Sequence, residues 1–237
     1  MRQLTLFNDI ILVPRADKEE ADELLARLRE RGPVIGTDEA GRGALAGPVI
    51  AASVYLTPEQ EKKLVAMKLR DSKKLTPKSR ERIFQAMNDL GVMWEAHSGT
   101  IARIERDNIL QASLWTMGES AKKLAARLDT PPSCVVVDGT ERIPKLKIPQ
   151  WTLIEADKLV PVVSAASIIA KVLRDQLMVK LSKKYPEYDF AQNKGYPTMQ
   201  HIEAVNKLGI SKAHRPYFCK TVLKNNGKGR DVDLAVD

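Results

Sequence analysis

The chain has 237 residues, and 43% of them are hydrophobic, which is enough to build the core of one large domain. Lysine and arginine number 38 against 30 acidic residues, and this net charge of +8 favours a polyanionic partner such as nucleic acid, although a basic protein without such a partner stays open on charge alone. The two cysteines, Cys134 and Cys219, fit a reducing compartment such as the cytoplasm, and the most apolar stretch, residues 159–173, is too short to span a membrane.

The first 32 residues are predicted to be an N-terminal appendage, flexible in part and without the pattern of a signal peptide. Residues 16–31 are charged, with a narrow apolar stripe at Leu24, Leu25 and Leu28, and this pattern indicates a surface helix.

A short segment ahead of that helix resembles the peptide by which many bacterial proteins dock on the replicative sliding clamp. Its anchors are Gln3, Leu4, Leu6 and Phe7. The alternative is a terminal strand or a hydrophobic patch that docks on the protein's own body.

Residues 34–49 contain the first chemical signal. Val34 and Ile35 begin a buried strand, which delivers the adjacent acids Asp38 and Glu39 near its end. Gly41, Arg42 and Gly43 follow, and two glycines around an arginine allow the backbone to approach a phosphate closely. Mg²⁺ is typically held by one or two carboxylates together with substrate phosphates, so this pattern fits a metal-assisted phosphate site. A strand followed by a glycine-rich turn with solvated acids stays open as the alternative.

The following residues alternate between strands and helices. Residues 48–56 form a second strand, antiparallel to the first, and Thr57-Pro58 and Thr76-Pro77 each begin a helix. A third strand is predicted over residues 92–98, and a long helical pattern over residues 100–128 breaks near Asp107 and Asn108.

Two further acids follow strands in the second half of the chain. Residues 133–137 form a buried strand that ends at Asp138, and Asp157 lies just beyond a strand over residues 151–155. Carboxylates that converge on one sheet edge repel one another unless cations compensate, and this is the arrangement of two-metal phosphodiester hydrolysis. The candidate catalytic and metal-binding residues are therefore Asp38, Glu39, Asp138 and Asp157, with Mg²⁺ or Mn²⁺ as the preferred ions.

At this point the sequence resembles the ribonuclease HII family, the type 2 ribonucleases H. The resemblance covers residues 34–218 in six ordered segments: GTDEAGRGALAGPV from Gly36, DSKKL at Asp71, VVVDG at Val135, VVSAASIIAKVLRD from Val162, NKGYPT at Asn193 and HRPYF at His214. It implies an α/β, ribonuclease H-like fold with a mixed five-stranded sheet flanked by helices and a C-terminal helical extension. Residues 33–219 would form this catalytic domain, and residues 220–237 would be a polar tail.

The resemblance also implies an activity: a monomeric endoribonuclease that cleaves the RNA strand of RNA–DNA hybrids and nicks duplex DNA on the 5′ side of single embedded ribonucleotides, using two metal ions. By position, Asp38, Glu39 and Asp138 match the family's metal-binding acids. Asp157 matches the fourth, and the competing Asp175 is expected to pair with a neighbouring base.

Substrate contacts are carried over in the same way. Gly41, Arg42 and Gly43 resemble the loop that senses the ribose 2′-OH, and Tyr196 resembles the tyrosine that checks the RNA-to-DNA junction. The sites predicted to contact phosphate, or to support residues that do, are Lys171, Lys194, His214 and Arg215. The alternatives are a non-catalytic protein that binds RNA–DNA hybrids and another metal nuclease of the same fold.

Overall fold

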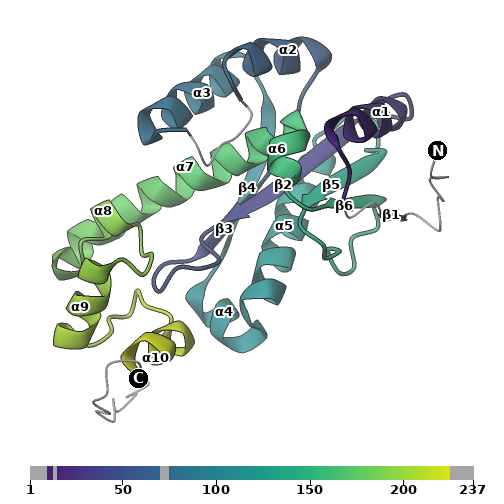
Figure 1. Cartoon of the computed structure of the whole chain (residues 1–237). Helices are drawn as coiled ribbons and strands as arrows, with labels where there is room; N and C mark the ends of the chain where they lie inside the picture. The colour runs from purple at the N-terminus through teal and green to yellow at the C-terminus, as the bar shows by residue number, and fades with distance from the viewer. Residues whose placement is uncertain (1–9, 13–14, 70–74, 225–237) are drawn as a thin grey trace.

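The centre of the computed structural model, which describes residues 10–12, 15–69 and 75–224, is a mixed six-stranded sheet (Figure 1). The strand order is β1-β6-β5-β2-β3-β4. The pairs β2–β3 and β3–β4 are antiparallel, whereas β2–β5, β5–β6 and β6–β1 are parallel. The strands are β1 (Ile10–Leu12), β2 (Val34–Ala40), β3 (Val49–Tyr55), β4 (Met93–Gly99), β5 (Cys134–Asp138) and β6 (Gln150–Leu153).

The five predicted strands are all present, which confirms the expected mixed sheet. The sixth, β1, comes from the N-terminal segment and pairs with the outer edge of β6. Helix α1 (Lys18–Arg29) is also more closely integrated than a surface helix, because Leu24, Leu25 and Leu28 are buried in the main hydrophobic core. The predicted clamp-binding peptide lies outside the described residues.

Helices cover both faces of the sheet. The long helix α7 (Pro161–Lys184) crosses β2 and β3 on one face, and α5 (Ile109–Ala125) covers the other (Figure 1). A Cβ atom at Gly36 would lie 2.5 Å from the backbone of Val162, so glycine is required where α7 crosses β2. This close crossing brings the middle of α7 beside the end of β2.

Local signals in the sequence explain where several helices begin. Thr57 and Gln60 form the predicted capping box of α2 (Pro58–Ala66), and Thr76 caps α3 (Pro77–Asp89). The helical pattern after Thr100 breaks at Asn108, whose φ of 66° separates α4 (Ile101–Asp107) from α5. Most of the DSKKL segment, residues 71–74, lies outside the described residues.

The predicted C-terminal helical extension follows α7. Its own small core includes Met178, Phe190 and Val205. Residues 220–224 continue the last helix, and the rest of the predicted tail lies outside the described residues. The elements are the 3₁₀ helix η1 (Pro186–Tyr188), α8 (Phe190–Asn193), α9 (Met199–Leu208) and α10 (Pro216–Lys224).

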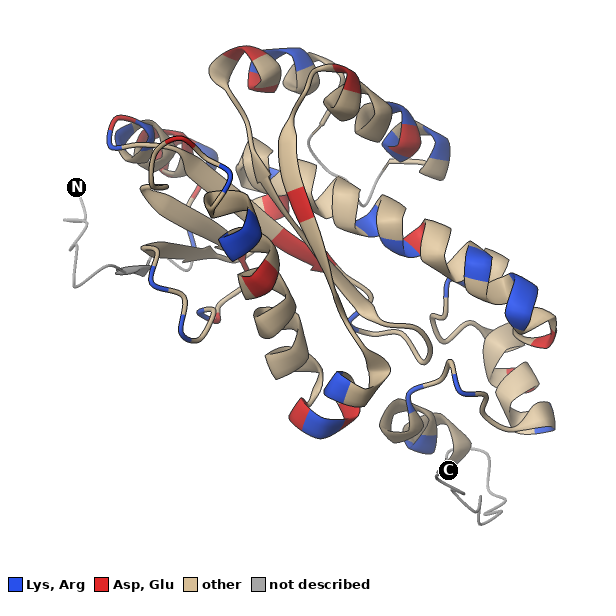
Figure 2. Cartoon of the chain, turned by 180° about the vertical axis from the view of Figure 1, so that it is seen from behind, with Lys and Arg blue, Asp and Glu red and all other residues tan. Residues whose placement is uncertain are grey.

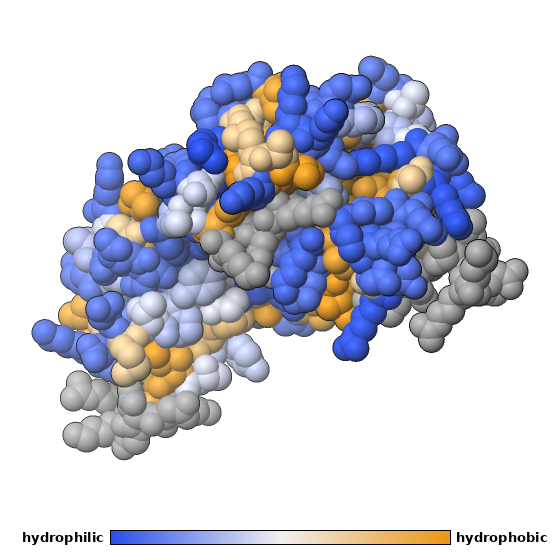
Figure 3. All heavy atoms as spheres, turned by 45° about the horizontal axis from the view of Figure 1, so that its top comes forward, coloured by the Kyte–Doolittle hydropathy of each residue, from blue (hydrophilic) through white to orange (hydrophobic). Residues whose placement is uncertain are grey.

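The polar character of the surface and the state of the two cysteines agree with the composition of the chain. The face seen in Figure 3 is mainly hydrophilic, with scattered apolar side chains. Both cysteines are free and buried, as predicted for Cys134. Among the residues that the structure describes, no helix combines the length and the apolar character that crossing a membrane requires.

Candidate active site

The strand β2 presents its two acids on opposite faces of the sheet. Asp38 is 5% exposed and faces α7, where Ser167 forms a hydrogen bond with its carboxylate. The same carboxylate accepts a hydrogen bond from the backbone N–H of Glu39 at 2.7 Å. These two hydrogen bonds restrain the orientation of the Asp38 carboxylate.

Asp138 comes to this point on the neighbouring parallel strand. Thr37 of β2 is paired with Val137 of β5, so Asp38 and Asp138 follow at the same level of the sheet. Gly139 has a φ of 112°, a conformation that lets the chain turn away directly after the acid.

The fourth carboxylate belongs to the one-turn helix α6 (Ala156–Leu159). Asp157 on this helix is fully buried, and its charge acts on Asp38. The structure therefore brings together all four acids that the sequence singles out, although they come from three separate elements.

Burial and mutual repulsion dominate the electrostatics of this cluster. Burial, followed by the charges of Asp138, Glu39 and Asp157, raises the pKa of Asp38 well above its usual value, against a hydrogen bond from Ser167 that lowers it. Burial also raises the pKa of Glu39 to about 7, and the nearby Arg42 guanidinium only partly offsets this. A divalent cation would relieve this repulsion.

The donor set fits Mg²⁺ or Mn²⁺ in chemistry. All four groups are hard oxygen donors, which these ions prefer. Within the described residues, no three His, Cys, Asp or Glu side chains are already arranged as ligands of one ion.

The loop after β2 turns beside the acids and exposes its middle. Gly41 has a φ of 100° and is buried, whereas Arg42 and Gly43 are exposed. Arg42 lies 3.4 Å from the carboxylate of Glu39. The backbone at Gly43 faces open space, so a ligand has access to it.

Tyr196 is half-buried beside two cations of α7. The Nζ atom of Lys171 and the Cζ atom of Arg174 each lie 5.1 Å from the centre of its ring. Lys171 forms an ion pair with Asp175 at 2.7 Å, which confirms the expectation that Asp175 pairs with a neighbouring base.

The remaining predicted contacts, Lys194, His214 and Arg215, differ in their exposure. Lys194 is half-buried, and its ammonium group donates to the carbonyl of Ala191. His214 and Arg215 are 2% and 0% exposed, so in this conformation they support the loop from behind and do not form its surface. Arg215 donates hydrogen bonds to the carbonyl oxygens of Arg42 at 3.0 Å and Gly47 at 2.8 Å.

Sequence reasoning missed Arg174 as part of this site. Its side chain is fully buried and donates to the carbonyl oxygens of Pro48, Ala46 and Lys194. The available signal was helical spacing: Arg174 lies seven residues after Ser167 and four before Met178, both on the buried face of α7.

Comparison with known proteins gives a consistent picture. A family model described as Ribonuclease HII matches residues 35–222. The chain is similar to the Ribonuclease HII of Acaryochloris marina, with 42% identity over 185 residues, 78% of this chain and 91% of the relative. It is 38% identical over 205 residues to the Ribonuclease HII of Zymomonas mobilis, covering 86% of this chain and 93% of that one.

Solved structures agree with this result and confirm the ribonuclease H-like fold. The ribonuclease H2 from Pyrococcus horikoshii OT3 matches with a TM-score of 0.62 at 27% identity, over 83% of this chain and all of the other. The RNase HII in a PCNA:RNase HII complex from Archaeoglobus fulgidus matches with a TM-score of 0.67 at 26% identity, over 84% and 98% of the two chains.

Proposed function

This chain belongs to the ribonuclease HII family and is a ribonuclease, and on that premise we propose that it nicks duplex DNA at single embedded ribonucleotides and cleaves the RNA strand of RNA–DNA hybrids. The observation that carries the proposal is the convergence of four carboxylates beside the Gly41–Gly43 loop and Tyr196. In this proposal the acid cluster provides the ligands for phosphodiester hydrolysis. The Gly41–Gly43 loop and Tyr196 select the nucleotide that is cleaved.

In this proposal Asp38, Glu39, Asp138 and Asp157 hold two Mg²⁺ or Mn²⁺ ions. Such ions, when bound, activate the attacking water and stabilise the leaving 3′ oxygen. The four carboxylates would hold the ions beside the scissile phosphate, and hydrolysis with water as the nucleophile would leave 3′-OH and 5′-phosphate ends. The burial of Asp38 and Asp157 supports this role, because a desolvated charge cluster binds divalent cations strongly.

The Gly41-Arg42-Gly43 loop, which is exposed at Arg42 and Gly43, is proposed to contact the ribose 2′-OH. Only this hydroxyl distinguishes RNA from DNA at a single nucleotide, and it both donates and accepts hydrogen bonds. The ring of Tyr196 is proposed to contact the next sugar and to exclude a ribose there. The half-buried position of Tyr196 beside Lys171 and Arg174 supports a fixed ring orientation.

Basic residues beside the site are proposed to bind the duplex backbone. Figure 2 shows acidic residues at the centre of the sheet and basic residues along α7 and near its C-terminal end. Lys171, partly exposed on α7, is proposed to contact a phosphate directly. His214 and Arg215 are proposed to position the loop that touches the substrate.

The decisive experiment compares three duplexes: DNA with one ribonucleotide, all-DNA, and a long RNA–DNA hybrid. We expect a nick on the 5′ side of the ribonucleotide that needs Mg²⁺ or Mn²⁺ and disappears with EDTA, and no cut in all-DNA. Cleavage of the long hybrid alone would reject the single-ribonucleotide proposal and the role of Tyr196, while keeping the ribonuclease activity.

Family membership argues against the non-catalytic alternative, and the proposed cellular role is to begin the repair of ribonucleotides in DNA. The free, buried cysteines support the cytoplasm as its compartment.

A sliding clamp is proposed as a partner through Gln3, Leu4, Leu6 and Phe7. The Archaeoglobus fulgidus relative is described in a complex with PCNA, which supports a clamp as the kind of partner.

A further inference from the structure

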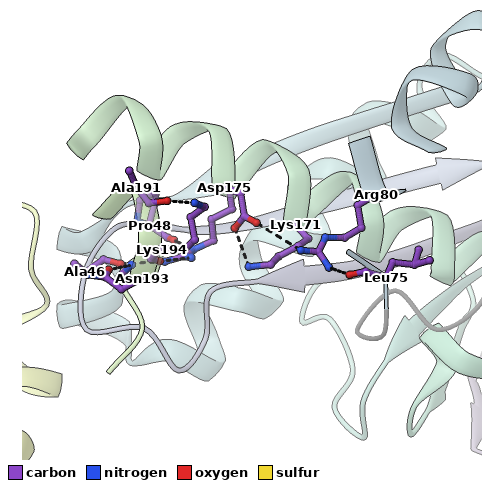
Figure 4. Close-up of polar contacts among 11 residues, drawn as sticks. Ala46, Pro48, Leu75, Arg80, Lys171, Asp175, Ala191, Asn193 and Lys194 are labelled. Carbon is purple, nitrogen blue, oxygen red and sulfur yellow. Dashed lines mark hydrogen bonds and ion pairs between the residues drawn. The ribbon is translucent and has the colours of Figure 1, made fainter. Parts of the chain in front are cut away.

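The buried side chain of Arg174 joins two segments that are far apart in the sequence. Its Nε and Nη2 atoms donate to the carbonyl oxygens of Pro48 at 3.1 Å and Ala46 at 3.0 Å, which belong to the connection between β2 and β3. Its Nη1 atom donates to the carbonyl of Lys194 at 2.8 Å, two residues before Tyr196. Figure 4 shows Ala46, Pro48 and Lys194 gathered beside α7.

Three glycines allow this contact. A Cβ atom at Gly41 would lie 2.0 Å from the Nε atom of Arg174, so the first residue of the exposed loop rests directly on the guanidinium group. A Cβ atom at Gly195 would lie 2.6 Å from the carbonyl oxygen of Ala46, and one at Gly47 would lie 2.4 Å from the sulfur of Met178. The two segments therefore meet without space for any side chain between them.

Backbone hydrogen bonds and Arg215 complete the junction. The N–H groups of Leu45 and Ala46 both donate to the carbonyl of Gly195, at 2.8 and 3.3 Å. Arg215 holds the carbonyls of Arg42 and Gly47. The Gly41–Pro48 connection is thus held by one arginine against the Tyr196 segment and by another against the start of α10.

The burial of the Arg174 guanidinium is energetically unfavourable, which indicates that its hydrogen bonds have a specific role. Taking a cation out of water is unfavourable, and all three acceptors of Arg174 are neutral backbone carbonyls, which do not compensate its charge. Burial accordingly lowers the pKa of Arg174. A guanidinium presents its donors in a rigid plane, so it fixes the relative position of its acceptors better than a flexible ammonium group.

We propose that Arg174 is a positioning residue for ribose selectivity, which sets the spacing between the 2′-OH-reading loop at Gly41–Gly43 and the junction-reading Tyr196. This inference rests on the proposed function of those two elements. When a single ribonucleotide lies in DNA, the Gly41–Gly43 loop and Tyr196 must contact two consecutive nucleotides at the same time. A long hybrid offers a 2′-OH at every position and depends less on their exact spacing.

The test measures kcat and KM of the full chain with Arg174→Lys on the single-ribonucleotide duplex and on the long hybrid. Lysine keeps the charge but cannot reach three acceptors in one plane. We expect the ratio of kcat/KM for the two substrates, single ribonucleotide over hybrid, to fall about 10-fold or more, mainly through kcat, because a misplacement near 1 Å is costly to catalysis. The matched control is Arg29→Lys, an arginine paired with Glu61 away from the site, which should keep the wild-type ratio.

A second variant protects the test against a folding defect. Gly195→Ala keeps the arginine but displaces one of its acceptors, because the new Cβ would lie 2.6 Å from the Ala46 carbonyl oxygen and the φ of 79° at this position disfavours alanine, so it should lower the same ratio. Thermal unfolding of each variant shows which of them are folded.

Two results would overturn this inference and leave the proposed function standing. One is an unchanged ratio of kcat/KM values in a folded Arg174→Lys chain. The other is an equal loss of kcat/KM on both substrates in both variants, which would indicate a merely structural role for Arg174. If Arg174→Lys does not fold, the ratio measured for Gly195→Ala decides. Failure of the wild-type chain to nick the single-ribonucleotide duplex would instead reject the proposed function, and the inference with it.

Discussion

Asp38 and Asp138 stand at the same level on two parallel strands, and the charge of Asp138 raises the pKa of Asp38. The two acids repel each other across β2 and β5, so the folded chain maintains an arrangement that is unfavourable without a cation. This relationship leads to the first two predictions.

Asp138→Asn should reduce cleavage by about 1,000-fold or more and leave duplex binding within a few-fold of wild type, because it removes an ion ligand and no basic residue. Nicking assays and fluorescence anisotropy with the single-ribonucleotide duplex measure the two effects. Glu141→Gln, which changes an exposed acid three residues later, is the control and should cleave normally. Equal losses of binding and cleavage would contradict the assigned role of Asp138.

Glu39→Gln should stabilise the metal-free chain at neutral pH. The pKa of Glu39 is raised from 4.5 to about 7, so between these values the folded chain binds more protons than the unfolded chain. The free energy of unfolding of the wild type therefore carries a penalty that appears as the pH rises through this window, up to roughly 3 kcal/mol.

Thermal unfolding in EDTA at pH 5 and pH 8 tests this prediction. The unfolding temperature of the variant should exceed that of the wild type mainly at pH 8. Added Mg²⁺ or Mn²⁺ should raise the unfolding temperature of the wild type more than that of the variant. A constant difference at both pH values would show that the charge of Glu39 is not the cause.

Tyr196→Ala should impair nicking at a single ribonucleotide more than cleavage of a long hybrid, by about 10-fold or more in kcat/KM. The expected reason is loss of the ring that distinguishes deoxyribose from ribose at the junction. Tyr196→Phe keeps the ring and should retain most of the discrimination. Equal effects of the alanine variant on both substrates would reject the junction role.

The contact between His201 and His214 leads us to expect a lower free energy of unfolding in acid. Their Nε2 atoms lie 3.0 Å apart, so one ring donates and the other must stay neutral to accept. Burial, and then the neighbouring His201, lowers the pKa of His214 from 6.5 to about 4. The folded chain thus binds fewer protons than the unfolded chain in this window, and stability present above pH 6.5 is lost as the pH falls towards 4.

The measurement is the unfolding free energy of wild type and His214→Asn from pH 7 to pH 4.5. The wild type should lose up to roughly 3 kcal/mol more than the variant. Burial, followed by the charge of Lys123, also lowers the pKa of His97 on β4, so His97→Gln should recover a smaller part of the same loss. Parallel pH profiles for the wild type and His214→Asn would contradict this explanation.

Deletion of residues 1–8 should abolish binding to a bacterial sliding clamp and leave nicking of a short duplex unchanged. Surface plasmon resonance with immobilised clamp measures the first effect. A chain with Leu6 and Phe7 both changed to alanine keeps the length and should behave like the deletion. Unchanged clamp affinity in both chains would remove this partner.

Much of this fold could be predicted because its signals are local. The strand that begins at Val34 and the capping box at Thr57 depend on residues a few positions apart, and the structure has both. Strand β1 was missed because three apolar residues next to a charged segment carry no distinctive pattern, and only pairing with β6 makes them a strand. Likewise, the leucine stripe of α1 gave its helical form but not the depth of its burial.

The acids of the site were predictable for a different reason. Asp38 and Asp138 follow apolar strands, and a carboxylate at a strand end is visible in the sequence. Arg174 was not, because its importance depends on the carbonyl oxygens of Ala46 and Lys194, which have no sequence signature. His214 and Arg215 were predicted to contact phosphate or to support residues that do, and only the structure shows that both side chains are buried.

The mixed sheet also has a consequence for the order of folding. Strands β2, β3 and β4 pair with neighbours close in the sequence, whereas β5 must close a loop of almost a hundred residues to reach β2. Asp38 and Glu39 lie on β2, whereas Asp138 and Asp157 lie on segments that reach β2 only through the long-range pairing of β5. A chain in which β5 has not paired with β2 has only two of the four acids in place, so we expect the proposed metal site to form only with that pairing.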